Sequence, residues 1–192
     1  MSAIDLAGFD ARFADDPDPW STFTDRDEAV KRQAILHALG PGPLGRVLEV
    51  AAGNGSNSAA IAPRTLRLDA TEATAAGTRL TAQAIARFAP RARALRLAVP
   101  APFPRARYDA IVVAELLYYL SAPAMARLAA DAARALRPGG RLVLAHHRID
   151  FHDFVQHAEP LQRRFLREAG GRWRVRIVRA TGRWRVIAAM RA

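Results

Sequence analysis

Short apolar segments recur along the chain and alternate with longer amphipathic ones. Residues 108–114 (YDAIVVA) form a continuous apolar run, which is typical of a strand that helices cover on both faces. Residues 94–99 instead alternate apolar and polar positions, as a strand does when one face is solvated. Segments of these two kinds predict strands at residues 47–50, 66–72, 94–99, 108–114 and 141–145.

Helices are expected between these strands, because apolar residues recur there at helical spacing and glycine or proline marks the ends. Thr24 or Asp25 can cap the first helix. Residues 1–24 are expected to be irregular, since Pro17 and Pro19 interrupt a helix. The expected helices cover residues 25–39, 56–62, 75–89, 122–136 and 151–169.

Two further strand-like segments close the chain, at residues 173–178 and 183–190. So short a connection between them indicates an antiparallel hairpin, because parallel strands need a long crossover. Together with the alternating strands and helices, this predicts an α/β fold with a mostly parallel, seven-stranded sheet and helices on both faces. We expect residues 41–192 to form this domain and residues 1–40 to cover its ligand site.

Composition excludes several classes of protein. The chain has 192 residues, of which 51% are hydrophobic and 24% charged, so it can bury a core as one domain. It has no cysteine, which rules out disulfides and cysteine-ligated metal. No uncharged run is long enough to span a membrane, and the first ten residues do not resemble a signal peptide. We therefore expect a cytoplasmic protein.

The formal net charge of +11 raises the possibility of a nucleic-acid partner. Arginine supplies nearly all of it, with 28 Arg against the single Lys31, and residues 161–192 carry ten Arg against Glu168. Arg172, Arg174 and Arg176 alternate with apolar residues, however, as on a half-buried strand with one charged face. We expect this basic tail to be structural and a nucleic-acid partner to be unlikely.

The loop after the first strand carries the clearest chemical signal. Gly53 and Gly55 permit a tight turn and a close approach of a ligand to the backbone. Glu49 precedes them at the end of the first strand, and Glu72 ends the second strand, where an acid can accept hydrogen bonds from a ribose diol. Ser58 stands where a nicotinamide-binding loop has its third glycine, so that fingerprint is incomplete.

Four separated motifs resemble the class I S-adenosylmethionine-dependent methyltransferases. They are EVAAGNG (49–55), Glu72, YDAIVVAELLYYL (108–120) and LRPGGRLVL (136–144). The segments DPDPW (16–20) and IAPRTLRL (61–68) are similar to the NodS family of nodulation N-methyltransferases. The resemblance covers residues 10–150 and implies a Rossmann-like methyltransferase domain.

This resemblance also implies a cofactor, S-adenosyl-L-methionine, and the residues around it. Glu49 would lie near the amino group of the methionine moiety, and Glu72 would accept from the ribose hydroxyls. The other cofactor-binding residues that it implies are Trp20, Ala51, Gly53, Asn54, Gly55, Ala73, Val99, Glu115 and Leu116.

Two positions depart from the pattern of the family. Ala51 replaces the first loop glycine, which is tolerable if its φ is negative. Ala98 and Val99 stand where an acid usually meets the adenine amino group. Loss of one charged hydrogen bond would weaken cofactor binding by ~1.5–3 kcal/mol.

Histidines at the end of the fifth strand are the candidates for a general base. Imidazole has an ordinary pKa near neutrality, which suits proton removal. Successive strand residues point to opposite faces, so one of His146 and His147 can face the acceptor, and we favour His146. The spacing of the nearby His152 and His157 fits no metal-ligand pattern, so no metal is expected.

Three functions remain open. The first is N- or O-methylation of a small molecule, with an amino sugar or glycolipid precursor suggested by the NodS likeness. The second is nucleic-acid methylation, although residues 114–117 (AELL) lack the Asn/Asp-Pro-Pro-Tyr/Phe motif of amino-directed DNA enzymes. The third is a methyltransferase-fold binding protein without catalysis, which the changes at Ala51 and Ala98 favour. Oligomeric state does not follow from the sequence.

Overall fold

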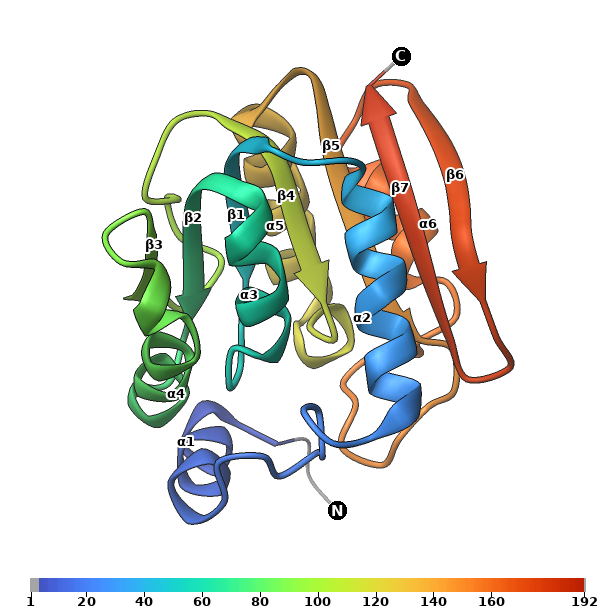
Figure 1. Ribbon diagram of the computed structural model, residues 1–192. Helices are drawn as coiled ribbons and strands as arrows, with labels where there is room; N and C mark the ends of the chain where they lie inside the picture. The colour runs from blue at the N-terminus through green and yellow to red at the C-terminus, as the bar shows by residue number, and fades with distance from the viewer. Residues whose placement is uncertain (1–3, 192) are drawn as a thin grey trace.

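The computed structural model describes residues 4–191, so residues 1–3 of the expected N-terminal segment and residue 192 lie outside it. Its strands are β1 (Leu44–Val50), β2 (Thr65–Glu72), β3 (Ala92–Arg96), β4 (Tyr108–Ala114), β5 (Leu136–His147), β6 (Trp173–Ala180) and β7 (Trp184–Arg191). They form one sheet in the order β3-β2-β1-β4-β5-β7-β6 (Figure 1). β7 runs antiparallel to β5 and β6, whereas β1 to β5 are parallel. The mostly parallel seven-stranded sheet with a C-terminal antiparallel hairpin is thus confirmed.

Helices cover both faces of the sheet (Figure 1). One face carries α2 (Arg26–Leu39), α3 (Ser56–Ile61) and α4 (Ala75–Ile85), and the other carries α5 (Ala122–Ala135) and α6 (Leu161–Glu168). Short 3₁₀ turns lie at Ala62–Arg64, Ala86–Phe88 and Leu117–Tyr119 (η3). The remaining helix, α1 (Leu6–Asp15), lies across the carboxyl ends of the parallel strands.

β4 supplies the centre of the core, as its continuous apolar run predicts. Ile111 and Val113 are buried among α5 and α6, whereas Ala110 and Val112 are buried among α2 and α3. Each face of the strand therefore has its own helical layer. Because the order of the sheet reverses between β1 and β4, the loops after these two strands diverge and leave room for a ligand.

The expectation of an irregular N-terminus is wrong, because residues 6–15 form α1. Asp5 caps this helix by accepting a hydrogen bond from the backbone N–H of Gly8 at 2.8 Å. Phe9 and Phe13, one turn apart, both pack against Trp20, with ring centroids 5.9 and 5.3 Å away. The two prolines that we took as helix breakers therefore end α1 rather than prevent it.

The expected helix 151–169 is reduced to α6, and residues 151–160 are irregular. Asp150 accepts a hydrogen bond from the backbone N–H of Ala158, which closes this segment into a loop. Phe154 stacks on Tyr118 across this loop, with ring centroids 3.7 Å apart. A contact between distant residues thus overrides the local helical pattern.

Two strand expectations also need correction. The third strand covers Ala92–Arg96, so Val99 lies beyond its carboxyl end instead of within it. β6 is not half-buried, because it is the edge strand and its apolar residues Val175 and Ile177 are 49% and 60% exposed. Packing of one face, which was our reason for interpreting the basic tail as structural, is therefore absent along most of β6.

Candidate functional site

A cavity of about 680 Å³ lies at the carboxyl edge of the parallel strands, under α1. The loop after β1, the end of β2, the loop after β4, the end of β5 and residues 151–154 all line it. Of the residues implied as cofactor-binding, those on the lining are Trp20, Ala51, Gly53, Asn54, Glu72, Ala73, Val99, Glu115 and Leu116.

Glu49 and Gly55 are not among the lining residues. Glu49 is 1% exposed and accepts a hydrogen bond from the Ser58 hydroxyl. Burial raises the pKa of Glu49 to about 7, although hydrogen bonds from Ser58 and Asn57 act in the opposite direction. The carboxylate therefore ties β1 to α3 behind the loop.

Glycine is required at position 55 for packing. Gly55 has a φ of 83°, and a Cβ there would lie 2.8 Å from the Thr81 Cα. Ala51 has a φ of 56°, so the expectation of a negative φ is wrong. The loop thus keeps the left-handed conformation of a glycine at Ala51, at a cost of ~1–2 kcal/mol for a residue with a Cβ.

Glu72 is held at the rim of the cavity by the loop that faces it. Its Oε2 accepts from the Gly53 backbone N–H at 3.0 Å, and its Oε1 accepts from the Thr74 backbone N–H and hydroxyl, both at 2.9 Å. Oε1 thus accepts two hydrogen bonds, whereas Oε2 keeps a free lone pair, so the group can accept a further hydrogen bond from a ligand.

Asp69, the other acid of β2, has a structural environment. It is 1% exposed, and it accepts from Arg93 at 2.6 Å, from Arg105 at 3.1 Å and from the Tyr108 hydroxyl at 2.9 Å. It does not line the cavity. Glu72 is therefore the acid of β2 that can reach a ligand.

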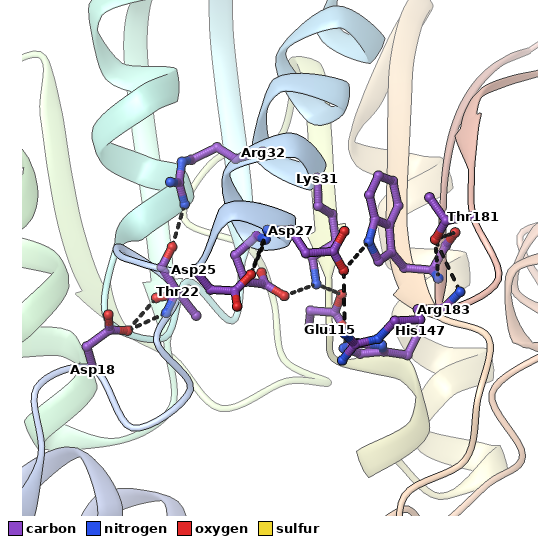
Figure 2. Close-up of polar contacts among 12 residues, drawn as sticks. Asp18, Thr22, Asp25, Asp27, Lys31, Arg32, Glu115, His147, Thr181 and Arg183 are labelled. Carbon is purple, nitrogen blue, oxygen red and sulfur yellow. Dashed lines mark hydrogen bonds and ion pairs between the residues drawn. The ribbon is translucent and has the colours of Figure 1, made fainter.

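The segment between α1 and α2 is fastened to the glycine loop through Asp18, which bonds to Asn54 and, within the segment, to Thr22 (Figure 2 shows the contact with Thr22). Asp18 Oδ1 accepts from the Thr22 backbone N–H at 2.6 Å and from Asn54 Nδ2 at 2.9 Å, and Oδ2 accepts from the Phe23 backbone N–H at 3.0 Å. Burial would raise the pKa of Asp18, but these hydrogen bonds outweigh it and lower the pKa. The Asn54 amide is therefore occupied by the N-terminal segment.

A chain of charged groups forms the floor of the cavity. Lys31 of α2 is 3% exposed, and its Nζ donates to Glu28 at 2.7 Å and to Glu115 at 2.6 Å (Figure 2). Glu115, which has a φ of 51°, also accepts from the Tyr118 hydroxyl. His147 Nε2 lies 3.8 Å from the same carboxylate. The five side chains come from three separate parts of the sequence.

Proximity to Lys31 keeps Glu115 ionised. Burial alone would raise the pKa of Glu115, but Lys31 and the imidazoles of His147 and His146 lower it to about 2. Burial likewise would lower the pKa of Lys31, yet Glu115 and Glu28 raise it. The floor therefore carries two carboxylates and one ammonium at neutral pH.

The structure reverses our preference between the two histidines. His146 is 1% exposed and packs edge-on against Tyr118 at 5.7 Å, and it does not line the cavity. Burial lowers its pKa to about 4. His147 lines the cavity beside Glu115. As the alternation of strand residues predicts, one of the two histidines faces the cavity, but it is His147 and not His146.

Aromatic side chains enclose the cavity above this floor, and of these the sequence analysis did not single out Phe9, Phe151 and Phe154. Phe9 meets Tyr119 edge-on at 5.0 Å, and Tyr119 meets Phe154 edge-on at 5.4 Å. Phe151 lies 5.3 Å from Phe154. The spacing of four residues between Phe9 and Phe13 could have indicated an aromatic face on a helix. Residues 151–154 lie in a loop, so no periodic pattern in the sequence indicates which way their side chains point.

Residues 4–191 hold no cluster of three or more His, Asp or Glu side chains that could bind a metal ion. Across the same residues, no helix has the length and apolar character needed to cross a membrane.

Residues 47–140 match the family of methyltransferase domains. No curated protein sequence matches the chain. Among solved structures, the N-methyltransferase NodS from Bradyrhizobium japonicum WM9, in complex with S-adenosyl-L-homocysteine, is similar over 96% of each chain, with a TM-score of 0.81 and 20% identity.

Two other solved structures extend this comparison. A protein from Pseudomonas syringae described as a methyltransferase is 25% identical, with a TM-score of 0.71 over 85% of this chain and 98% of that one. Geranyl diphosphate C-methyltransferase from Streptomyces coelicolor A3(2) is 18% identical, with a TM-score of 0.68 over 86% and 79%. These findings confirm the resemblance that the sequence motifs indicated. Residues 47–140 match the methyltransferase-domain family, and the chain has a methyltransferase fold similar to that of NodS.

Proposed function

We propose that the protein transfers a methyl group from S-adenosylmethionine to a nitrogen or oxygen atom of a small molecule. The observation that carries this proposal is the position of Glu72 at the rim of a cavity that the glycine loop also lines. S-Adenosylmethionine is the cofactor of this class of enzyme, and a cavity of about 680 Å³ has room for it and for an acceptor.

The lining residues fit the parts of this cofactor. The free lone pair of Glu72 Oε2 suits a ribose hydroxyl, and the backbone of residues 51–54 can lie against the methionine moiety. Ala73 and Val99 would contact the adenine ring. Residues 4–40 would cover the bound cofactor, with Trp20 on the cavity lining and Asp18 holding the segment in place.

When bound, S-adenosylmethionine supplies an electrophilic methyl group on a sulfonium. The residues of the chain then have two tasks, which are to align the acceptor with that methyl group and to remove a proton. His147 would take the proton, because it faces the cavity and the ionised Glu115 beside it can stabilise the imidazolium. The aromatic side chains around it would exclude water from the acceptor.

Amino sugars and glycolipid precursors remain candidate acceptors through the likeness to NodS, an N-methyltransferase. A nucleic acid is not favoured, because the cavity lining is acidic. A protein that binds the cofactor without catalysing methyl transfer would need the same contacts with the cofactor. A measurement of turnover therefore distinguishes it from an enzyme.

Calorimetric titration with S-adenosyl-L-homocysteine tests the proposal. We expect saturable binding to the wild-type protein, and a loss of ~2–3 kcal/mol for Glu72→Gln, because charge-assisted hydrogen bonds weaken. Asp69→Asn is the matched control in the same strand, and it should lower stability while leaving affinity for the ligand within about 0.5 kcal/mol. Absence of heat with the wild-type protein at high concentration contradicts the proposal.

A further inference from the structure

The cavity has a charge opposite to that of the protein. The whole chain carries a formal net charge of +11, yet five carboxylates line the cavity against two permanent cations, Arg12 and Lys31. The five acids are Asp5, Glu28, Glu72, Glu115 and Asp153. In so basic a protein, an acidic cavity indicates selection for a positively charged ligand.

These acids divide into two groups by position. Glu72 lies at the glycine loop, where the proposed function places the ribose, and Asp5 is engaged in capping α1. Glu28, Glu115 and Asp153 lie on the side of η3 and residues 151–154, with Lys31 as the single cation among them. The acceptor end of the cavity therefore has an excess of negative charge.

The walls at this end are aromatic. Tyr118 and Phe154 stack with an interplanar angle of 9°, and Tyr119 and Phe151 each meet Phe154 edge-on. Aromatic faces attract organic cations through the ring quadrupole, and they also give an apolar or planar group a surface to pack on. Arg12 of α1, which lies 5.8 Å from the centroid of the Trp20 ring, is the only arginine among the described residues that line the cavity. Its charge acts on Tyr119, but the acids Glu28, Glu115 and Asp153 still outnumber Arg12 and Lys31 together.

We propose that the acceptor is an amine that enters as a cation on an aromatic or aliphatic body, with its ammonium beside Glu115 and its body against Tyr119, Phe151 and Phe154. This inference rests on the proposed function and narrows it. It sets aside acceptors that carry a carboxylate or phosphate, and it ranks a simple apolar amine above an amino sugar, whose hydroxyls find few partners on the aromatic walls.

The reaction that follows is balanced. The ammonium gives one proton to His147, and the nitrogen lone pair then forms a bond to the methyl carbon while the carbon–sulfur bond breaks and leaves its electron pair on sulfur. One primary ammonium and one S-adenosylmethionine thus yield one N-methylammonium, one S-adenosylhomocysteine and one proton, which His147 passes to water.

A matched series of probes tests this inference on wild-type protein saturated with S-adenosylhomocysteine. Calorimetry compares phenethylamine with 2-phenylethanol, which lacks the charge, with phenylalanine, which adds a carboxylate, and with glucosamine, an amine on a sugar. We expect phenethylamine to bind at least about tenfold more tightly than each of the others.

Two variants tie the preference to the residues named. Asp153→Asn and Glu115→Gln should each reduce affinity for phenethylamine about tenfold or more while leaving that for 2-phenylethanol unchanged. Glu159→Gln, an exposed carboxylate outside the cavity lining, is the control and should have no effect. Asp153 is half-buried in a loop, so its variant should fold even if Glu115→Gln does not.

The outcomes separate this inference from the function on which it rests. If S-adenosylhomocysteine binds but phenethylamine binds no better than 2-phenylethanol, phenylalanine or glucosamine, the amine inference is overturned and the methyltransferase function stands. The amine inference is also overturned if Asp153→Asn and a folded Glu115→Gln both keep the full affinity for phenethylamine. If S-adenosylhomocysteine does not bind, both fail.

Discussion

Replacement of Lys31 by methionine should destabilise the fold strongly, because it removes the counter-charge of a partly buried carboxylate, Glu115. The pKa of Glu115 falls from its ordinary value of 4.5 to about 2 in the folded protein. At about 1.4 kcal/mol per pKa unit, this corresponds to about 3 kcal/mol of folding free energy at neutral pH. Lys31 is the largest of the groups that lower this pKa, so we expect Lys31→Met to cost about 2–3 kcal/mol.

The dependence on pH gives this prediction its signature. Because the pKa of Glu115 is depressed by folding, its contribution is present above pH 4.5 and is lost as the pH falls from 4.5 through about 2. The difference in unfolding free energy between wild type and Lys31→Met, measured by urea denaturation, should therefore be constant near pH 7 and shrink below pH 4.5. Arg26→Met, an exposed position on the same helix, should change stability by less than about 0.5 kcal/mol. The reasoning would be refuted if Lys31→Met lowers the unfolding free energy by less than about 1 kcal/mol, or if this loss is the same at pH 3 as at pH 7.

Three further predictions concern the cavity. His147→Gln should lower the rate of methyl transfer about 10²–10⁴-fold and remove the rise of the rate with pH, measured as a pH–rate profile; a parent-like profile would mean that His147 takes no proton. Ala51→Gly should raise the unfolding free energy by ~0.5–1 kcal/mol, because glycine adopts the φ of 56° without strain, and a loss of stability would contradict this account of the loop. Asp18→Ala should speed dissociation of S-adenosylhomocysteine in stopped-flow measurements, since it releases the N-terminal segment from Asn54, whereas an unchanged rate would show that this segment does not cover the ligand.

Sequence patterns predicted the elements whose form depends on local burial. β4 is buried on both faces, so its apolar run identified it without ambiguity. Asp25 caps α2 as the sequence indicates, by accepting from the backbone N–H of Asp27 at 2.6 Å. The loop 151–160 and α1 were missed for the same physical reason, since contacts between distant aromatic residues decide both.

The candidate site was predicted where it follows from the ends of strands. Glu72 and Gly53 come together because β1 and β2 are parallel neighbours, and the sequence places both at carboxyl ends. The ion pair between Lys31 and Glu115 was not predicted, because the two residues lie 84 positions apart and no local pattern connects them. The preference for His146 over His147 was reversed because the alternation shows that the two side chains point to opposite faces, but not which face borders the cavity.

The central claim is that the cavity at the carboxyl edge binds S-adenosylmethionine, and a crystal structure of the complex with S-adenosyl-L-homocysteine tests it most directly. The account predicts a ribose hydroxyl within hydrogen-bond distance of Glu72, the adenine beside Ala73 and Val99, and the sulfur atom facing the end of the cavity that holds Glu115 and His147. Electron density for the ligand elsewhere on the protein, or in this cavity with the ribose away from Glu72, would contradict the account.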